Sequence, residues 1–290
     1  MAIELFKKDA EKVPPEPQYF LSATNMQTLN YKVYYMSKTE KLLYGLLAFV
    51  VGAVVGYVFF GGIGIDEFGE PTQLTRILNI VIPSVVGVIA AIIFIPIRTK
   101  QIVEKRRRML RTQFRDMLDG LNTSFGSGKN VPNAFASVLE DMKMQYDEGA
   151  FIVNELEIIQ SGILNNIAIE DILNDLGRRS GIDDIKSFAD VFEISYRKGG
   201  NMKEIIKNTH AILSDKMEIN EDIETAVSAS KMEQNLILIM PVAIVAMIKF
   251  SSPDFAANFT TGSGLISTAV AIVLFIVAYF IGKKVLDIKV

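Results

Sequence analysis

Residues 42–65 read LLYGLLAFVVGAVVGYVFFGGIGI, a run of 24 positions without an Asp, Glu, Lys, Arg or His. A helix of about 20 such residues, rising 1.5 Å per residue, crosses the roughly 30 Å hydrocarbon core of a membrane. Two similar stretches lie at residues 77–97 and 265–282. A fourth, at 235–252, is weaker, because its unbroken apolar run covers only residues 236–248 and also fits a buried core helix. We expect four transmembrane helices at these positions.

Basic residues flank three of the expected spans and indicate their orientation. They are Lys32, Lys38 and Lys41 before the first span, seven Lys and Arg residues within 98–111 after the second, and Lys283, Lys284 and Lys289 after the fourth. Cytoplasmic segments of membrane proteins are enriched in Lys and Arg, and four spans place all three flanks on the cytoplasmic side. We therefore predict a multi-pass protein of the cell (inner) membrane, with a cytoplasmic N-terminal arm at 1–41, a cytoplasmic domain at 98–234 and a cytoplasmic tail at 283–290.

The amino-acid composition excludes most common types of catalytic site. The chain has no Cys, no Trp and one His, and 50% of its residues are apolar. The sequence therefore excludes disulfides and Cys nucleophiles, and it lacks the His and Cys residues that usually bind metals. The expected spans also lack the ionisable residues that transporters use, apart from Lys249 near the end of the third. We predict no catalytic residue, no cofactor, no metal site and no enzymatic activity.

The expected N-terminal arm is polar and contains Pro14, Pro15 and Pro17. We predict that it is partly disordered around these prolines. We expect no secretory signal peptide, because the first apolar run begins only at residue 42 and no small-residue cleavage site follows it.

The expected cytoplasmic domain shows helical periodicity throughout. Helical segments are predicted at 108–125, 131–146, 151–163, 170–179 and 183–197. The residues expected to face its core include Val131, Ala134, Phe135, Val138, Leu139 and Met142 in the second segment and Phe188, Val191, Phe192 and Ile194 in the last. No alternating pattern of strand length occurs in this domain. We predict an all-α fold, in which an antiparallel helical bundle is inserted between spans two and three.

Two glycine turns divide these segments in the same way. The first contains Gly126 and Gly128 followed by Asn130, and the second contains Gly199 and Gly200 followed by Asn201. Glycine ends helices and Asn caps their N-termini, so each turn predicts a helix end and a new start. A shift of 71 residues superimposes the two turns, which fits either an internal repeat or two unrelated helical hairpins.

Residues 126–130, GSGKN, do not fit a phosphate-binding loop, because Asn130 replaces the required Ser or Thr and the segment follows a helix. His210, alone on the last helix, is expected to be a packed or surface residue. After Asn201 no helix breaker occurs before Pro241, so a helix beginning at residue 202 is predicted to continue into the third span.

Charge is distributed unevenly over the expected cytoplasmic domain. Residues 98–111 hold seven basic residues and one acidic residue, a pattern that favours contact with anionic lipid headgroups. Residues 112–235 hold 12 basic and 22 acidic residues, a net charge of −10 that disfavours nucleic-acid binding. Asp215, Glu218 and Asp222 form an acidic face on the last helix. This face is either a solvated surface or a docking surface for a basic partner.

Small residues recur at helical spacing in the first two spans. Gly52 and Gly56 form one pair, and Gly87 and Ala91 form another. Such pairs let helix backbones approach closely inside a membrane. They predict packing between the two spans or, alternatively, a contact between copies of the chain.

Residues 177–241 carry a family resemblance. They begin GRRSGIDDIKSFADVFEISYRKGGNMKEIIKNTHAIL and continue SDKMEINEDIETAVSASKMEQNLILIMP. The resemblance lies in the arginine pair at 178–179, the turn of Gly199, Gly200 and Asn201, the helix led by Met202 with Glu204, and the proline inside the following span. With two spans before a helical domain and two after it, residues 80–290 resemble the type II secretion system F domain proteins. The chain is most similar to the inner-membrane platform proteins of tight-adherence pili. It departs from the family pattern at residues 215–224, which are largely acidic where a more basic run is expected.

The resemblance implies a platform protein without catalytic residues, which couples a cytoplasmic hexameric secretion ATPase to the extraction of pilin subunits. Its implied partners are that ATPase, pilins, membrane lipids and either a paralogous platform protein or a second copy of the chain. Platforms of type II secretion, type IV pili and archaeal flagella share the domain. The alternative is a membrane receptor or scaffold whose helical domain signals.

Overall fold

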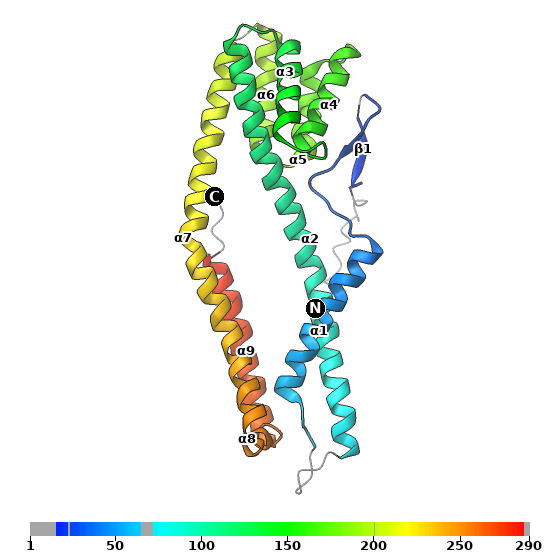
Figure 1. Ribbon diagram of the computed structural model, residues 1–290, viewed down its shortest axis with the longest axis vertical. Coiled ribbons are helices and arrows are strands. Elements are labelled where there is room, and N and C mark those ends of the chain that lie inside the picture. The colour runs from blue at the N-terminus through cyan, green and yellow to red at the C-terminus, as the bar shows by residue number, and fades with distance from the viewer. Residues whose placement is uncertain (1–15, 23, 65–71, 200, 287–290) are drawn as a thin grey trace, which may run out of the picture. The chain divides into compact units, whose positions relative to one another are not determined.

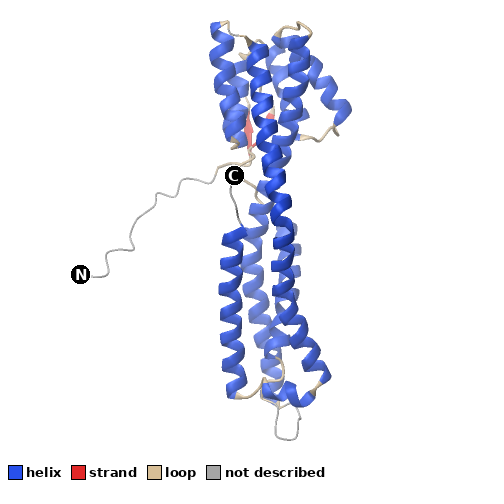
Figure 2. Cartoon of the chain, turned by 90° about the vertical axis from the view of Figure 1, so that its left-hand side faces the viewer, coloured by secondary structure: helices blue, strands red, loops and turns tan. Residues whose placement is uncertain are grey.

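The computed structural model describes residues 16–22, 24–64, 72–199 and 201–286, and within them the chain is predominantly helical (Figure 2). Its elements, labelled in Figure 1 where there is room, are β1 (Tyr19–Leu21), β2 (Gln27–Leu29), α1 (Lys38–Phe60), α2 (Gln73–Gly126), α3 (Val131–Gln145), α4 (Phe151–Leu164), α5 (Ile169–Ser180), α6 (Asp183–Lys198), α7 (Met202–Ser251), α8 (Pro253–Asn258) and α9 (Gly262–Leu286).

Four of the described helices, α1, α2, α7 and α9, are long and apolar enough to cross a membrane. Helices α2 and α9 contain the expected stretches at 77–97 and 265–282. Helix α1 contains residues 42–60 of the first stretch and ends at Phe60, and the C-terminal part of α7 contains residues 235–251 of the weaker one. The helices α2 and α7 have 54 and 50 residues, more than twice the length that a membrane crossing requires. Both therefore continue well beyond their apolar segments.

The chain divides into two compact units. The first, here called the helical unit, comprises residues 1–35 and 102–213, and the second, the span unit, comprises residues 36–101 and 214–290. Both α2 and α7 contribute residues to each unit as uninterrupted helices. Helix α2 passes through residue 98 and α7 through residue 234 without a break.

The core of the helical unit is built from the inward faces of its helices. The six α3 residues expected to face the core are all buried, which confirms the periodicity of that segment. Four aromatic rings pack edge-on or tilted in a chain from Phe114 through Phe188 and Phe192 to Phe135, at centroid distances of 5.4 to 6.3 Å. These rings join α2, α3 and α6 around one apolar centre.

Two core predictions for α6 were wrong. Val191 is 44% exposed and Ile194 is 55% exposed, whereas Phe188 and Phe192 are buried as expected. On a helix with 100° between successive residues, positions 191 and 194 lie about 110° and 170° from the centre of the buried face that Ile185, Phe188, Ala189 and Phe192 form. Val191 and Ile194 are apolar, but their positions along the helix turn them away from the buried face of α6.

The N-terminal arm contains a folded segment that the sequence analysis did not predict. Its strands β1 and β2 pair antiparallel, with Phe20 opposite Thr28. The turn between them includes Asn25 at a φ of 58°, a left-handed conformation that Asn tolerates better than most residues. Residues 16–35 belong to the helical unit, so this part of the predicted arm is not disordered. Pro14 and Pro15 lie outside the described residues.

In the span unit, α1 packs closely against α2 through glycines. A Cβ added to Gly52 would lie 2.7 Å from the Ala90 Cβ, and one added to Gly87 would lie 2.7 Å from the Phe49 carbonyl oxygen. Contacts this short leave no room for a side chain, so the small residues serve packing within the chain. Gly52 meets both Ala90 and Gly87, whose Cα would lie 3.0 Å from its added Cβ.

Lys249 and Gln234 make polar contacts between other helices of the span unit. The Lys249 ammonium donates a hydrogen bond of 2.9 Å to the Gly61 carbonyl at the end of α1 and lies 5.2 Å from the Phe259 ring centroid. Gln234 in α7 donates a weaker bond of 3.4 Å to the Tyr279 carbonyl of α9. Lys249 thus places its charge at the end of a span rather than within it.

Candidate functional site

The second glycine turn has the geometry that its sequence predicts. Gly199 follows α6 with φ 71° and ψ 31°, and its N–H donates to the Ser195 carbonyl. Asn201 then accepts a hydrogen bond of 3.3 Å from the Glu204 N–H and so caps α7. Glycine adopts this left-handed conformation without the steric cost that a Cβ imposes. Gly200, which was predicted to share this role, lies outside the described residues.

The first glycine turn repeats this arrangement. Gly128 has a φ of 81°, and the Asn130 side chain accepts a hydrogen bond of 3.1 Å from the Asn133 N–H. The Lys129 ammonium donates to the Ser137 hydroxyl at 2.6 Å. Residues 126–130 therefore form a helix end and a capped helix start, and their lysine contacts a neighbouring helix.

The acidic face on α7 is exposed. Asp215, Glu218 and Asp222 are all solvent-accessible, whereas Leu213 and Met217 on the same helix are buried. At 100° per residue the three carboxylates lie within about 60° of one another and on the side opposite Leu213. The sequence prediction that they share one exposed face is consistent with this arrangement.

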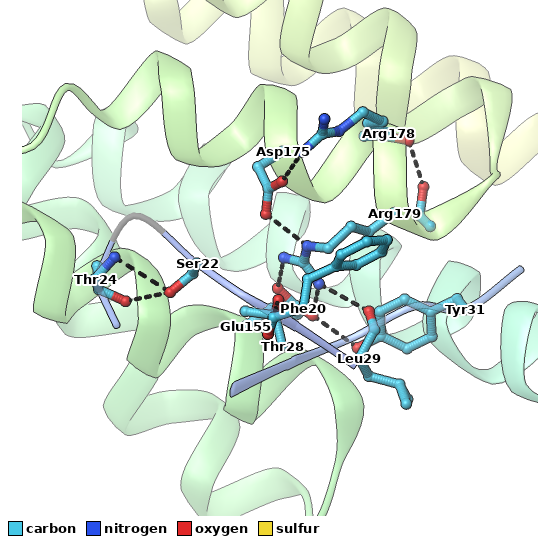
Figure 3. A network of polar contacts seen from close by, with 12 residues as sticks. Phe20, Ser22, Thr24, Thr28, Leu29, Tyr31, Glu155, Asp175, Arg178 and Arg179 are labelled. Carbon is cyan, nitrogen blue, oxygen red and sulfur yellow. Dashed lines mark hydrogen bonds and ion pairs between the residues drawn. The ribbon is translucent and has the colours of Figure 1, made fainter. Parts of the chain in front are cut away.

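A buried polar network centres on Arg179, near the end of α5 (Figure 3). Its guanidinium donates two hydrogen bonds to the Glu155 carboxylate of α4, at 2.7 and 2.9 Å, and one of 2.6 Å to Asp175. A fourth bond, of 2.9 Å, goes to the Leu29 carbonyl in β2. The Arg179 and Glu155 side chains are only 1% and 3% exposed. This is a fully buried bidentate ion pair of the kind that Arg forms best.

The same network holds the N-terminal arm to the helices. The Tyr31 hydroxyl donates a hydrogen bond of 2.9 Å to Glu155, and the Tyr31 N–H donates one of 3.0 Å to the Arg179 carbonyl. The Tyr31 ring also packs edge-on against Phe151. Burial, reinforced by the adjacent Glu155 charge, raises the pKa of Tyr31 well above its ordinary value. The phenol is thus a neutral donor at physiological pH.

Electrostatics keep Arg179 charged in this buried position. Burial alone lowers its pKa, but hydrogen bonding and attraction to Glu155, together with Asp175, more than offset that effect and raise it above its ordinary value. The Arg179 guanidinium is therefore charged and hydrogen-bonded to Glu155, Asp175 and the Leu29 carbonyl. It is suited to holding segments together rather than to acid–base chemistry.

Potential metal ligands are dispersed in the part of the chain that the structure describes. Within it, no group of three or more His, Cys, Asp and Glu side chains has the proximity that a metal ion requires. His210 lies 3.8 Å from the Asp119 carboxylate, a contact that links α7 to α2 within the helical unit. This agrees with the expected packed or surface histidine.

Sequence reasoning missed the Arg179 network, although it singled out the arginine pair at 178–179. Arg178 is 76% exposed and pairs with Asp175, whereas its neighbour Arg179 is buried. A lone sequence offers one weak signal for this difference. Position 179 lies three residues after Leu176 and seven after Ile172, and so falls on the buried face of α5.

Comparison of the chain with protein-family models, with curated proteins and with solved structures gave no match. What the protein does is therefore inferred from its own residues.

Proposed function

We propose that this protein is an inner-membrane platform of a tight-adherence pilus or of a related type II secretion machine. In this role it has no catalytic residues. A cytoplasmic hexameric secretion ATPase supplies the energy, and the platform transmits the resulting motion to pilin subunits in the membrane. The helical unit and both termini are cytoplasmic in this proposal, as the basic flanks of the spans favour.

The observation that carries the proposal is the continuity of α7. This helix starts at the turn of Gly199 and Asn201, contributes Ile206 and Leu213 to the buried core of the helical unit, and continues as one helix to Ser251. Its 50 residues correspond to about 75 Å of helix rise. A displacement of the helical unit would therefore reach the apolar segment through covalent, hydrogen-bonded backbone rather than through a flexible linker. Helix α2 offers a second connection of the same kind.

Pro241 gives this connection a place to bend. It lies inside α7, within the apolar segment, where it lacks the N–H for one backbone hydrogen bond. Sharp helix bends concentrate at such prolines. In the proposed mechanism, motion received at the N-terminal part of α7 is redirected near Pro241.

The acidic face of Asp215, Glu218 and Asp222 is the proposed docking surface for the ATPase. It is exposed and lies on the transmitting helix itself. Charged surfaces mainly set encounter rate and partner choice, so loss of one carboxylate should have a mild effect and reversal of all three a severe one.

The test is the simultaneous reversal Asp215→Lys, Glu218→Lys and Asp222→Lys in the full chain. The matched control reverses three exposed acids of the helical unit, away from α7, Glu140→Lys, Asp141→Lys and Glu148→Lys, and so makes the same change in net charge. Both variants should insert normally. The first should lose salt-sensitive co-purification with the secretion ATPase and should abolish pili, whereas the control should retain both.

Two results would count against these ideas separately. If the α7 reversal binds the ATPase as wild type does, the docking surface lies elsewhere. If deletion of the whole chain leaves pili and secretion intact, and the wild-type chain never co-purifies with the ATPase, the platform role itself fails. A signalling receptor or scaffold would then be the better description.

A further inference from the structure

A groove of about 360 Å³ lies between α7 and α9 in the span unit. Its volume falls in the range of roughly 300–1,000 Å³ that is typical of small-molecule sites. The two helices, which run side by side in Figure 1, contact each other directly at this level. The Gln234 side chain of α7 reaches the Tyr279 carbonyl of α9, and a Cβ built on Gly282 would lie only 2.3 Å from the Gln234 Nε2. The groove therefore follows a packed helix pair within one unit.

The groove lining changes from polar to apolar along both helices. On α7, Glu233 precedes the apolar run of 236–248, whereas Ile237 lies inside that run. On α9, Phe275 lies inside the segment Gly262–Gly282, which is long and apolar enough to cross a membrane. One end of the groove is therefore polar, and the other end is lined by the apolar side chains of two candidate spans.

The polar end lies at the depth of lipid headgroups when these helices cross a membrane. Glu233 is three residues before Leu236, where the apolar run of α7 begins, which is a helix rise of about 4.5 Å. The headgroup layer extends about 5–8 Å beyond the hydrocarbon core on each side. Tyr279, three residues before the end of the apolar segment of α9, is 39% exposed and of the residue type that lies at this boundary. Glu233 is therefore within reach of headgroup atoms.

The charge of the groove lining comes from Glu233 in the described part of the chain. Its side chain is exposed, and no side-chain hydrogen bond or ion pair joins it to another described residue. The hydroxyl groups of Ser230 and Tyr279, which also line the groove, are uncharged donors and acceptors. A carboxylate beside uncharged hydroxyls attracts a cationic group and repels an anionic one. The complementary ligand therefore carries a cation at the headgroup level and an apolar chain on the side of the spans.

We propose that this groove binds phosphatidylethanolamine, with the lipid ammonium at Glu233 and one acyl chain along Ile237 and Phe275. A primary ammonium offers three N–H donors, and its hydrogen bonds to a carboxylate are charge-assisted. Phosphatidylcholine carries the same charges, but its methylated ammonium has no N–H to donate. Phosphatidylglycerol lacks the ammonium, and its net negative charge opposes that of Glu233. The site rests on the packing and composition of α7 and α9 and not on the proposed platform function.

The experiment uses the full-length chain in neutral detergent and measures lipid affinity by native mass spectrometry. The probes are phosphatidylethanolamine, phosphatidylcholine and phosphatidylglycerol with the same acyl chains, and free phosphoethanolamine. Phosphatidylethanolamine should bind roughly tenfold more tightly than phosphatidylcholine, because only its ammonium can donate hydrogen bonds to the carboxylate. Free phosphoethanolamine should not bind in the same concentration range, because it buries no acyl chain. Equal affinity for phosphatidylethanolamine and phosphatidylcholine would overturn the proposal, as would equal affinity for the free headgroup.

Two variants test the polar and the apolar parts of the groove separately. Glu233→Gln removes the charge of an exposed side chain and should weaken phosphatidylethanolamine binding roughly tenfold, whereas the matched change Glu140→Gln in α3 should leave it unchanged. Ala278→Leu enlarges an exposed residue of the groove lining and should also weaken binding, whereas Val277→Leu, at an exposed position outside the lining, should not. Wild-type affinity for phosphatidylethanolamine in either Glu233→Gln or Ala278→Leu would refute the site.

Discussion

Replacing Arg179 with Met should release the N-terminal arm from the helical unit. The substitution keeps much of the side-chain volume but removes four hydrogen bonds, two of them to Glu155. Glu155, only 3% exposed, would keep the Tyr31 hydroxyl as its remaining donor. Removing one partner of a buried ion pair leaves an uncompensated charge and costs about 3–5 kcal/mol. At 1.36 kcal/mol per factor of ten, this corresponds to roughly a 150-fold to 5,000-fold change in an opening equilibrium.

Amide hydrogen exchange of Tyr31 is a suitable measurement. Its N–H bonds to the backbone carbonyl of residue 179, which the substitution leaves in place, so its protection reports opening of the arm rather than loss of the acceptor. Protection of the Tyr31 amide in Arg179→Met should fall by roughly 150-fold to 5,000-fold, up to the limit set by global unfolding. The matched control is Arg178→Met, because Arg178 adjoins Arg179 but is 76% exposed. Exposed pairs contribute less than about 1 kcal/mol, so this control should change protection only a few-fold.

A second variant separates buried charge from lost packing. Arg179→Met combined with Glu155→Gln removes both charges and keeps an acceptor for the Tyr31 hydroxyl. It should therefore regain much of the protection lost in the single variant. If Arg179→Met exchanges no faster than Arg178→Met, the ion pair does not hold the arm, and the reasoning from burial is refuted.

Three further predictions concern single positions. Gly199→Val should destabilise the helical unit by about 1–2 kcal/mol and Gly199→Asn by less, because only the left-handed backbone conformation opposes a side chain there. Equal thermal stability of the Val and Asn variants would contradict a constrained turn. Gly52→Ala should lower the melting temperature of the full chain in detergent, whereas Gly45→Ala, whose Cβ would meet only one atom at 3.9 Å, should not. Burial and the hydrogen bond to Asp116 raise the pKa of Tyr146 from 10.0 to about 12. Because the Tyr146 phenol ionises at a lower pH in the unfolded chain, it should reduce native stability as pH rises from about 10 to 12. Tyr146→Phe should therefore remove one tyrosine from the high-pH end of an alkaline absorbance titration. An unchanged titration above pH 11 would contradict the raised pKa of Tyr146.

Much of the fold was predictable because its signals are local. A long stretch without charges specifies a membrane helix by itself, since backbone polar groups in lipid must bond within the helix. The Asn130 cap and the buried face of α3 likewise depend on residues a few positions apart. The left-handed Gly199 follows from the same short-range rules.

The hairpin and the Arg179 network were missed because their causes are distant in sequence. Tyr31 and Glu155 are 124 positions apart, and Leu29 and Arg179 are 150 apart. Arginine is rarely buried unless it is paired, so a single sequence favours an exposed side chain at each arginine. Only the tertiary structure shows which of two adjacent arginines meets the carboxylate.

The pairing of Arg179 with the N-terminal arm has a consequence for biosynthesis. The donor to the Leu29 carbonyl, the Arg179 guanidinium, is synthesised 150 residues after Leu29. At about 5–20 residues per second, that delay is roughly 8–30 s, on the scale of translation itself. By then the apolar residues of α1 and the first part of α2 have already left the ribosome. The arm is therefore fastened only after the first pair of membrane helices has been synthesised, and during that interval the nascent chain carries an unpaired hairpin beside its first membrane helix.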